Sequence, residues 1–166
     1  MMNECEVNNN ISTKEEFINS KNISEKYLLI LPCSKRKKNL PMAEAIELYD
    51  GPFYQIFRKH KRANIDVLIL SAKYGLIEGT DIILPYDLRM TPEIARNKKK
   101  DVQCKLKHHL ESNKYHKVLI NLGKSYRIVI EDCDFQVDHN LSPEFLEGPI
   151  GIRNSGLKKW LMEIKE

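Results

Sequence analysis

Side chains able to do chemistry gather at three places in the chain, each directly after a run of apolar residues. Pro32-Cys33-Ser34-Lys35-Arg36-Lys37 follows the first run, Ser71-Ala72-Lys73-Tyr74-Gly75 the second, and Asn121-Leu122-Gly123-Lys124-Ser125-Tyr126 the third. A thiol can act as a nucleophile, a lysine can bind an anion, and hydroxyl groups can orient a substrate. These segments predict one binding or catalytic site if the fold brings them together.

Cys33 is the candidate nucleophile of the first segment. It precedes a predicted helix and stands beside Lys35, Arg36 and Lys37, whose charges favour its thiolate. No histidine accompanies it in the sequence. Two interpretations stay open: Cys33 is a nucleophile, or it is a small residue that fits a tight turn between strand and helix.

The same loop also suits a binding role. Its backbone N–H groups, the Ser34 hydroxyl and one of its lysines could hold a phosphate or a carboxylate. It is not a P-loop, because it contains no glycine, and Gly123-Lys124-Ser125 lacks the upstream glycine of that motif.

Two further segments supply candidates. Lys73 and Tyr74 precede Gly75, a residue suited to a positive φ or to close approach of a ligand. Pro85 fixes an extended turn that can direct Tyr86 and Asp87 toward the same site. Alternatively, Tyr86 packs on the core and Asp87 makes a local turn or cap.

The apolar runs have the continuous character of strands buried on both faces. They predict strands at 27–31, 65–70 and 117–122, with a weaker fourth at 135–138, and helices at 43–49, 53–61, 92–113, 123–131 and 155–165. This order predicts a single Rossmann-like α/β domain with an open, mostly parallel sheet of at least four strands and helices on both faces. Ligands of such sheets lie outside the carboxyl ends of the strands, where the three segments fall.

Length and composition agree with one globular domain. The chain has 166 residues, of which 42% are hydrophobic and 30% charged, and its longest apolar run, 27–32, is too short to span a bilayer. The start has no apolar signal-peptide region. We expect a cytoplasmic protein without membrane association, with residues 1–25 as an acidic N-terminal arm and 26–166 as the domain.

The charge is unevenly distributed. Residues 1–25 carry five glutamates and two lysines, so the net charge of +4 divides into −3 for the arm and +7 for the rest. Basic clusters at 35–38, 58–62 and 96–100 supply the positive charge. They indicate a phosphate-bearing partner, either a nucleotide-like small molecule or tRNA or DNA, or else an ordinary solvated surface.

The cysteines and histidines do not form a metal-binding pattern. Cys5, Cys33, Cys104 and Cys133 are widely spaced, and His60, His108, His109, His116 and His139 are scattered. We expect free thiols and no metal site; only His139, after the possible fourth strand, could reach the strand ends. The sequence specifies no cofactor and no oligomeric state.

Four ordered blocks carry a family resemblance. They are I-L-P-C-S-K-R-K (30–37), L-Y-D-G-P-F-Y (48–54), I-L-S-A-K-Y-G-L-I (69–77) and L-P-Y-D-L-R-M (84–90). They resemble a family of small, largely uncharacterised bacterial, archaeal and phage domains that share C-S-x-x-K, L-Y-x-G-x-x-F, S-A-x-[YH]-G-L and P-Y-D. The ending G-P-I-G-I-R…L-K-K-W-L (148–161) is similar to the tail of that family.

The segment P-C-S-x-x-K (32–37) is also similar to the P-C-S-x-x-K-P-Y-S-x-S-x-x-H motif of archaeosine synthase, which modifies a 7-deazaguanine base in tRNA. The resemblance implies a related site for a nucleobase or nucleotide, with Cys33, Ser34 and Lys37 as matching residues. The chain departs from the motif after Lys37, where Lys38-Asn39-Leu40 replaces P-Y-S and the trailing histidine is absent.

Three functions follow as hypotheses. The first is an enzyme, transferase- or lyase-like, that acts on a nucleobase, nucleoside or nucleotide, as in tRNA or DNA modification. Its candidate catalytic residues are Cys33, Lys37 and Asp87, and its candidate substrate-binding residues are Ser34, Ser71, Lys73, Tyr74, Tyr86, Gly123 and Tyr126. The second is a non-catalytic nucleic-acid-binding module, RNA-binding through its basic clusters, in which the C-S-x-x-K loop only grips phosphate. The third is a small-molecule sensor or partner subunit.

Overall fold

A computed structural model describes residues 24–135 and 141–165 of the chain. The elements run in the order β1 (Tyr27–Pro32), β2 (Ala43–Glu44), α2 (Ala45–Leu48), α3 (Pro52–Lys59), β3 (Ile65–Ser71), β4 (Gly75–Glu78), β5 (Ile82–Ile83), α4 (Pro92–Ser112), β6 (Lys117–Ile120), α5 (Lys124–Arg127), the 3-10 helix η1 (Ile128–Ile130), β7 (Glu144–Phe145) and α6 (Ile150–Glu163). The protein is therefore a mixed α/β structure.

A five-stranded, mostly parallel sheet forms its centre. The strand order is β4-β3-β1-β6-β7, and β2 and β5 pair separately as a small antiparallel ribbon. β1 pairs in parallel with both β3 and β6, and β7 is parallel to β6, whereas β4 is antiparallel to β3 at one edge. The predicted parallel arrangement of the first three strands and the minimum of four strands are confirmed.

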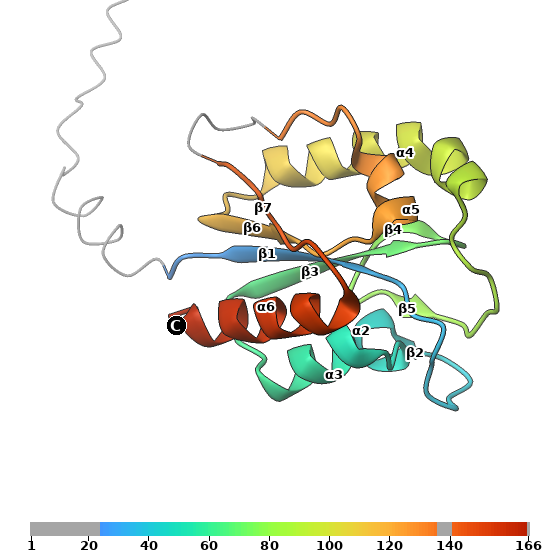
Figure 1. Cartoon of the computed structure of the whole chain (residues 1–166), viewed down its shortest axis with the longest axis horizontal. Helices are drawn as coiled ribbons and strands as arrows, with labels where there is room; N and C mark the ends of the chain where they lie inside the picture. The colour runs from blue at the N-terminus through green and yellow to red at the C-terminus, as the bar shows by residue number, and fades with distance from the viewer. Residues whose placement is uncertain (1–23, 136–140, 166) are drawn as a thin grey trace, which may run out of the picture.

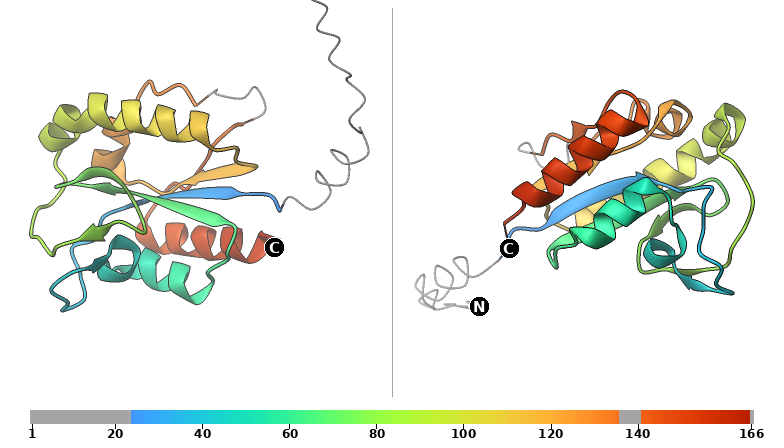
Figure 2. Two further views of the ribbon diagram at one scale, coloured as in Figure 1. Left: turned by 180° about the vertical axis from the view of Figure 1, so that it is seen from behind. Right: turned by 60° about the horizontal axis from the view of Figure 1, so that its bottom comes forward.

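Helices cover both faces of the sheet, as predicted. Figure 1 shows α3 and α6 on one side and α4 and α5 on the other, and the left view of Figure 2 shows the same division from behind. Successive side chains of β1 pack alternately on the two faces of the sheet. Leu29 and Leu31 pack in the core beneath α3 and α6, whereas Leu28 and Ile30 pack in the core beneath α4 and η1. All six residues of β1 are buried, as the apolar run requires of a central strand.

Some element boundaries differ from the predictions. The helix predicted at 43–49 is shorter, because residues 43 and 44 pair with β5 as β2. α6 begins at Ile150, before the predicted start at residue 155. The prediction missed its first turn because most residues there are exposed and lack the apolar periodicity of the second half of the helix. The helix predicted at 123–131 divides into α5 and η1.

The far strands of the sheet were also missed or misplaced. β4 was not predicted; it follows β3 through a tight turn that ends at Gly75, whose φ is +74°. The fourth strand was predicted at 135–138. Residue 135 is not in a strand, residues 136–138 lie outside the described residues, and the partner of β6 is β7.

The predicted N-terminal arm lies almost wholly outside the described residues, as do Cys5 and His139. None of the helices in the described part of the chain combines the length and apolar character that crossing a membrane requires.

Candidate active site

The chain topology reverses at the carboxyl edge of the sheet, by which we mean the edge where β1, β3 and β6 end. From β1 the chain passes through α2 and α3 to β3, and from β3 it returns through α4 on the opposite face to β6. From β6 the chain continues to β7, on the side of β6 away from β1. The connection after β1 therefore runs toward one edge of the sheet and the connection after β6 toward the other. Such a reversal point is where open α/β sheets bind ligands.

Cys33 lies at this reversal point in contact with a tyrosine from the neighbouring strand's connection. Its Sγ lies 3.1 Å from the Tyr126 hydroxyl, which also donates a hydrogen bond to the Cys33 carbonyl at 3.3 Å. The Tyr54 hydroxyl donates to the Pro32 carbonyl at 2.6 Å. Two phenols thus fix the end of β1, and the half-buried thiol is held between the ends of β1 and β6.

Three hydroxyl groups meet next to the end of β3, and we call Tyr49, Ser71 and Tyr86 the hydroxyl cluster. The Tyr86 oxygen lies 2.6 Å from the Tyr49 oxygen and 2.7 Å from Ser71 Oγ. The backbone N–H groups of Lys73 and Tyr74 both donate to Ser71 Oγ, which fixes that hydroxyl at the turn. Tyr49 and Ser71 are fully buried, whereas Tyr86 is half-buried and faces the opening.

Two lysines stand over the ring of Tyr86. Lys37 Nζ lies 4.4 Å from its centroid and Lys73 Nζ lies 5.8 Å from it, while Tyr74 packs edge-on against the same ring at 5.5 Å. A shallow, open hollow of about 560 Å³ lies here, lined by Lys35, Lys37, Lys38, Asn39, Pro85, Tyr86 and Asp87. The first two predicted segments and the P-Y-D turn therefore converge on one ring.

Burial sets the protonation of these groups. It raises the pKa of Tyr49 to about 12 and raises the pKa of Tyr54, Tyr86 and Tyr126, and the charge of a Cys33 thiolate raises all four further. Desolvation lowers the pKa of Lys37, against the opposing charges of Cys33 and Asp87. The phenols are therefore neutral hydrogen-bond donors at neutral pH, and they surround a thiol and an ammonium group.

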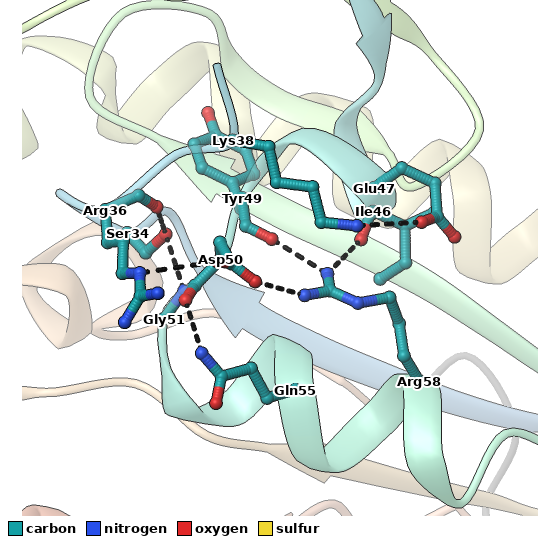
Figure 3. Close-up of polar contacts among 10 residues, drawn as sticks. All are labelled: Ser34, Arg36, Lys38, Ile46, Glu47, Tyr49, Asp50, Gly51, Gln55 and Arg58. Carbon is teal, nitrogen blue, oxygen red and sulfur yellow. Dashed lines mark hydrogen bonds and ion pairs between the residues drawn. The ribbon is translucent and has the colours of Figure 1, made fainter. Parts of the chain in front are cut away.

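A network behind the first loop holds it in place (Figure 3). Ser34 Oγ donates to the Arg36 carbonyl at 2.6 Å and accepts from the Gly51 N–H at 3.2 Å. A Cβ at position 51 would lie 2.9 Å from the Ser34 Cβ, so this close approach requires glycine. The Ser34 hydroxyl is thus engaged with the backbone and positions the loop.

The second part of this network is an ion-pair cluster. Asp50 accepts from Arg58 at 2.5 Å and pairs with Arg36 at 3.3 Å, and Arg58 also donates to the carbonyls of Ile46 and Tyr49 (Figure 3). Arg58 therefore ties α3 to the segment that carries Tyr49. The positive charge of Arg58 is therefore balanced within the protein by Asp50.

Most of the candidates named from the sequence come together at the carboxyl edge: Cys33, Lys37, Ser71, Lys73, Tyr74, Tyr86 and Tyr126. Asp87 is exposed on the rim beside Lys37. Gly123 follows β6 and lies beside the guanidinium of Arg153. Tyr49 and Tyr54 were not named as site residues, although both lie in the block L-Y-D-G-P-F-Y. Among the described residues, no three His, Cys, Asp or Glu side chains form a group suited to a metal ion.

The comparisons with known proteins give a fold and a family. No curated protein matches the chain. The crystal structure of AF0587, a protein of unknown function, is similar, with a TM-score of 0.54 and 16% sequence identity. The match covers 86% of this chain and 45% of that one, so the chain spans less than half the length of AF0587. At this identity the likeness shows a shared fold.

The family follows from the sequence match. A model of the family of unknown function DUF6884 matches residues 28–159, from the first strand to the last helix. The expectation of an uncharacterised family is thereby confirmed. The chain belongs to DUF6884.

Proposed function

We propose that the protein is an enzyme that acts on a nucleobase, nucleoside or nucleotide at the carboxyl edge of a Rossmann-like domain. The observation that carries this proposal is the convergence on Tyr86 of the hydroxyl cluster and two lysines, next to a thiol. Tyr86 is within 2.7 Å of two hydroxyl oxygens and has Lys37 and Lys73 over its ring. Preorganised donors and cations at one opening are what enzymes use to stabilise developing negative charge.

A planar, polar substrate suits this arrangement. Aromatic side chains stack on bases, and Tyr74 and Tyr86 stand at the opening with rings 5.5 Å apart. Neutral phenols can donate to the acceptor atoms of a base, and the two ammonium groups can stabilise negative charge on oxygen atoms of the substrate. Lys37 is half-buried and Lys73 is exposed, so one positive charge lies deeper in the site and the other at its rim.

The roles follow from position. Cys33 is the candidate nucleophile, in contact with the Tyr126 hydroxyl at 3.1 Å. Lys37 and Lys73 bind anionic groups, and Asp87 on the rim is the candidate general acid or base. The resemblance of P-C-S-x-x-K to the archaeosine synthase motif supports a nucleobase-modifying reaction of the transferase or lyase type, with tRNA modification as the model.

A nucleic-acid-binding module without catalysis is the second candidate. It relies on the basic clusters, three of whose charges form ion pairs. Arg58 pairs with Asp50 in a largely buried contact, whereas Lys38 pairs with Glu47 at 3.6 Å and Lys99 with Asp132 at 3.8 Å at the surface. The Arg58 pair favours the enzyme, because a phosphate-binding groove needs free cations, while the two surface pairs decide little.

Binding measurements test the proposal. Native mass spectrometry of freshly purified protein, followed by calorimetric titration with nucleobases, nucleosides and nucleoside monophosphates, is expected to find one bound class at a ratio of one per chain. A Tyr86→Ala variant should lose that binding, whereas Tyr115→Phe, remote from the carboxyl edge, should keep it. If the protein binds only tRNA or DNA, with affinity falling steeply as salt rises, the binding module replaces the enzyme.

A further inference from the structure

Arg153, the last residue of the block G-P-I-G-I-R, is a buried arginine without a described carboxylate partner. It is 9% exposed, and its Nε donates a 2.8 Å hydrogen bond to Asn121 Oδ1. Among the described residues, neither its Nη2 nor the Nδ2 of the fully buried Asn121 has a hydrogen-bond partner. Within residues 24–135 and 141–165, no ion pair of Arg153 with an acidic side chain is found.

The two unpaired donors belong to the two groups that this hydrogen bond joins. Nε and Nη2 form one edge of the guanidinium fork, and Oδ1 and Nδ2 belong to one amide, so both unpaired nitrogens flank the same hydrogen bond. The orientation of the Asn121 amide is fixed, because only its oxygen can accept from Nε. An acceptor placed beside this hydrogen bond can receive from Arg153 and Asn121 together.

Leaving this pair unsatisfied is costly. An uncompensated buried charge destabilises a protein, as does each buried donor without an acceptor. Desolvation and the nearby positive charge of Arg127 lower the pKa of Arg153. The Phe53 ring lies 4.9 Å from the guanidinium carbon and offsets only part of this cost. An anion would supply both the missing charge and the missing acceptors.

The pair lies next to the candidate active site. Asn121 directly follows β6, and its N–H donates to the carbonyl of Ile30 in β1. Nη1 of Arg153 lies 3.5 Å from the position that a Cβ of Gly123 would take, so the guanidinium lies against the backbone that follows β6. Three residues later, Tyr126 contacts the Cys33 thiol. Arg153 also lies in the first turn of the 14-residue helix α6, at the positive end of its dipole.

We propose that Arg153 and Asn121 bind the terminal phosphate of the substrate, so that the substrate class is a nucleoside monophosphate and not a free base. This inference rests on the proposed function, since it uses the same edge of the sheet. A terminal phosphate suits this position better than a phosphodiester, because the receiving nitrogens are buried and a diester would need room for the chain on both sides of the bound group.

Inorganic phosphate is the probe for the subsite. The melting temperature of the wild type is expected to rise with phosphate relative to sodium chloride of equal ionic strength, because a ligand of the native state stabilises it. Arg153→Gln should lose this response. Asn121→Asp should also lose it and should melt no lower than the wild type in chloride, because it gives Arg153 an internal carboxylate partner. Lys124→Gln, which removes an exposed charge next to Gly123, should respond like the wild type.

The outcomes separate the inference from the proposed function. If Asn121→Asp and Lys124→Gln both keep the phosphate response, or the wild type has none, Arg153 is not an anion site; Asn121→Asp decides this even if Arg153→Gln fails to fold. If Arg153→Gln binds nucleoside monophosphates as tightly as the wild type, the inference fails and the proposed function stands. If phosphate binds through Arg153 but no nucleoside or nucleotide binds, the anion site stands while its assignment to a nucleotide and the proposed function fail.

Discussion

Replacing Lys37 by alanine is expected to weaken the binding of a nucleotide ligand by about a hundredfold, or about 3 kcal/mol, the loss of a charge-assisted contact in a partly desolvated site. Lys37 is the lysine of its cluster that lies over the Tyr86 and Tyr49 rings, at 4.4 and 5.6 Å. Lys35 is exposed, and Lys38 pairs with Glu47. Their replacement removes the same charge from the rim and should change the affinity by a factor of about three or less.

The measurement is a calorimetric titration of the three alanine variants with the same ligand, beside a urea titration of each. Lys37 also donates to the Ser34 carbonyl at 3.0 Å, so Lys37→Ala should lose about 1 kcal/mol of unfolding free energy. That loss is too small to unfold the protein. Equal losses of affinity in all three variants would show a diffuse electrostatic surface and would favour the nucleic-acid-binding module.

Alkaline pH is expected to destabilise the protein strongly. The pKa of six of the seven tyrosines is raised, in each case chiefly by burial. A raised pKa means that the folded state holds protons that the unfolded state releases. Its contribution to stability is therefore complete below pH 10, the ordinary pKa of tyrosine, and is lost as the pH rises through the folded value.

For Tyr49 the folded pKa is about 12, so this residue alone should remove about 2 to 3 kcal/mol between pH 10 and pH 12. Urea titrations across this range measure the loss, and absorbance at 295 nm reports the phenolates as they form. Tyr49→Phe should show a shallower fall than the wild type. A free energy of unfolding that stays constant up to pH 12 would mean that these phenols are not buried donors.

The sequence was sufficient to predict the three strands whose ends form the site, because a run of apolar residues is a local feature of the chain. The run that became β1 is continuously apolar and the runs that became β3 and β6 are mostly so, which is typical of strands covered on both faces. The rule that ligands bind at carboxyl ends then pointed to Cys33, Lys73 and Tyr126 without knowledge of any contact, and the family pattern singled out Lys37 among the lysines of its cluster.

The remainder depends on tertiary contacts that periodicity does not encode. Tyr49 belongs to the site only because the loop after β1 runs beside it, in a bridge between residues 37 and 49. Asn121 and Arg153 are 32 residues apart in the sequence. They pair because α6 lies on the side of the sheet to which the Asn121 side chain points, just beyond the end of β6. The short strands β4 and β7 form because they hydrogen-bond to β3 and β6, and their own composition does not mark them as strands. Neither was predicted from the sequence.

Protection of Cys33 from alkylation tests the central claim most directly, namely that a nucleotide-like ligand binds at the carboxyl edge. Iodoacetamide labelling, followed by mass spectrometry of the peptides, gives the rate at each cysteine with and without saturating ligand. Cys104, exposed on α4, is the control within the same chain. A site at the carboxyl edge predicts that the ligand slows labelling of Cys33 and leaves the rate at Cys104 unchanged. A ligand shown to be bound in the same samples that leaves both rates unchanged would contradict it.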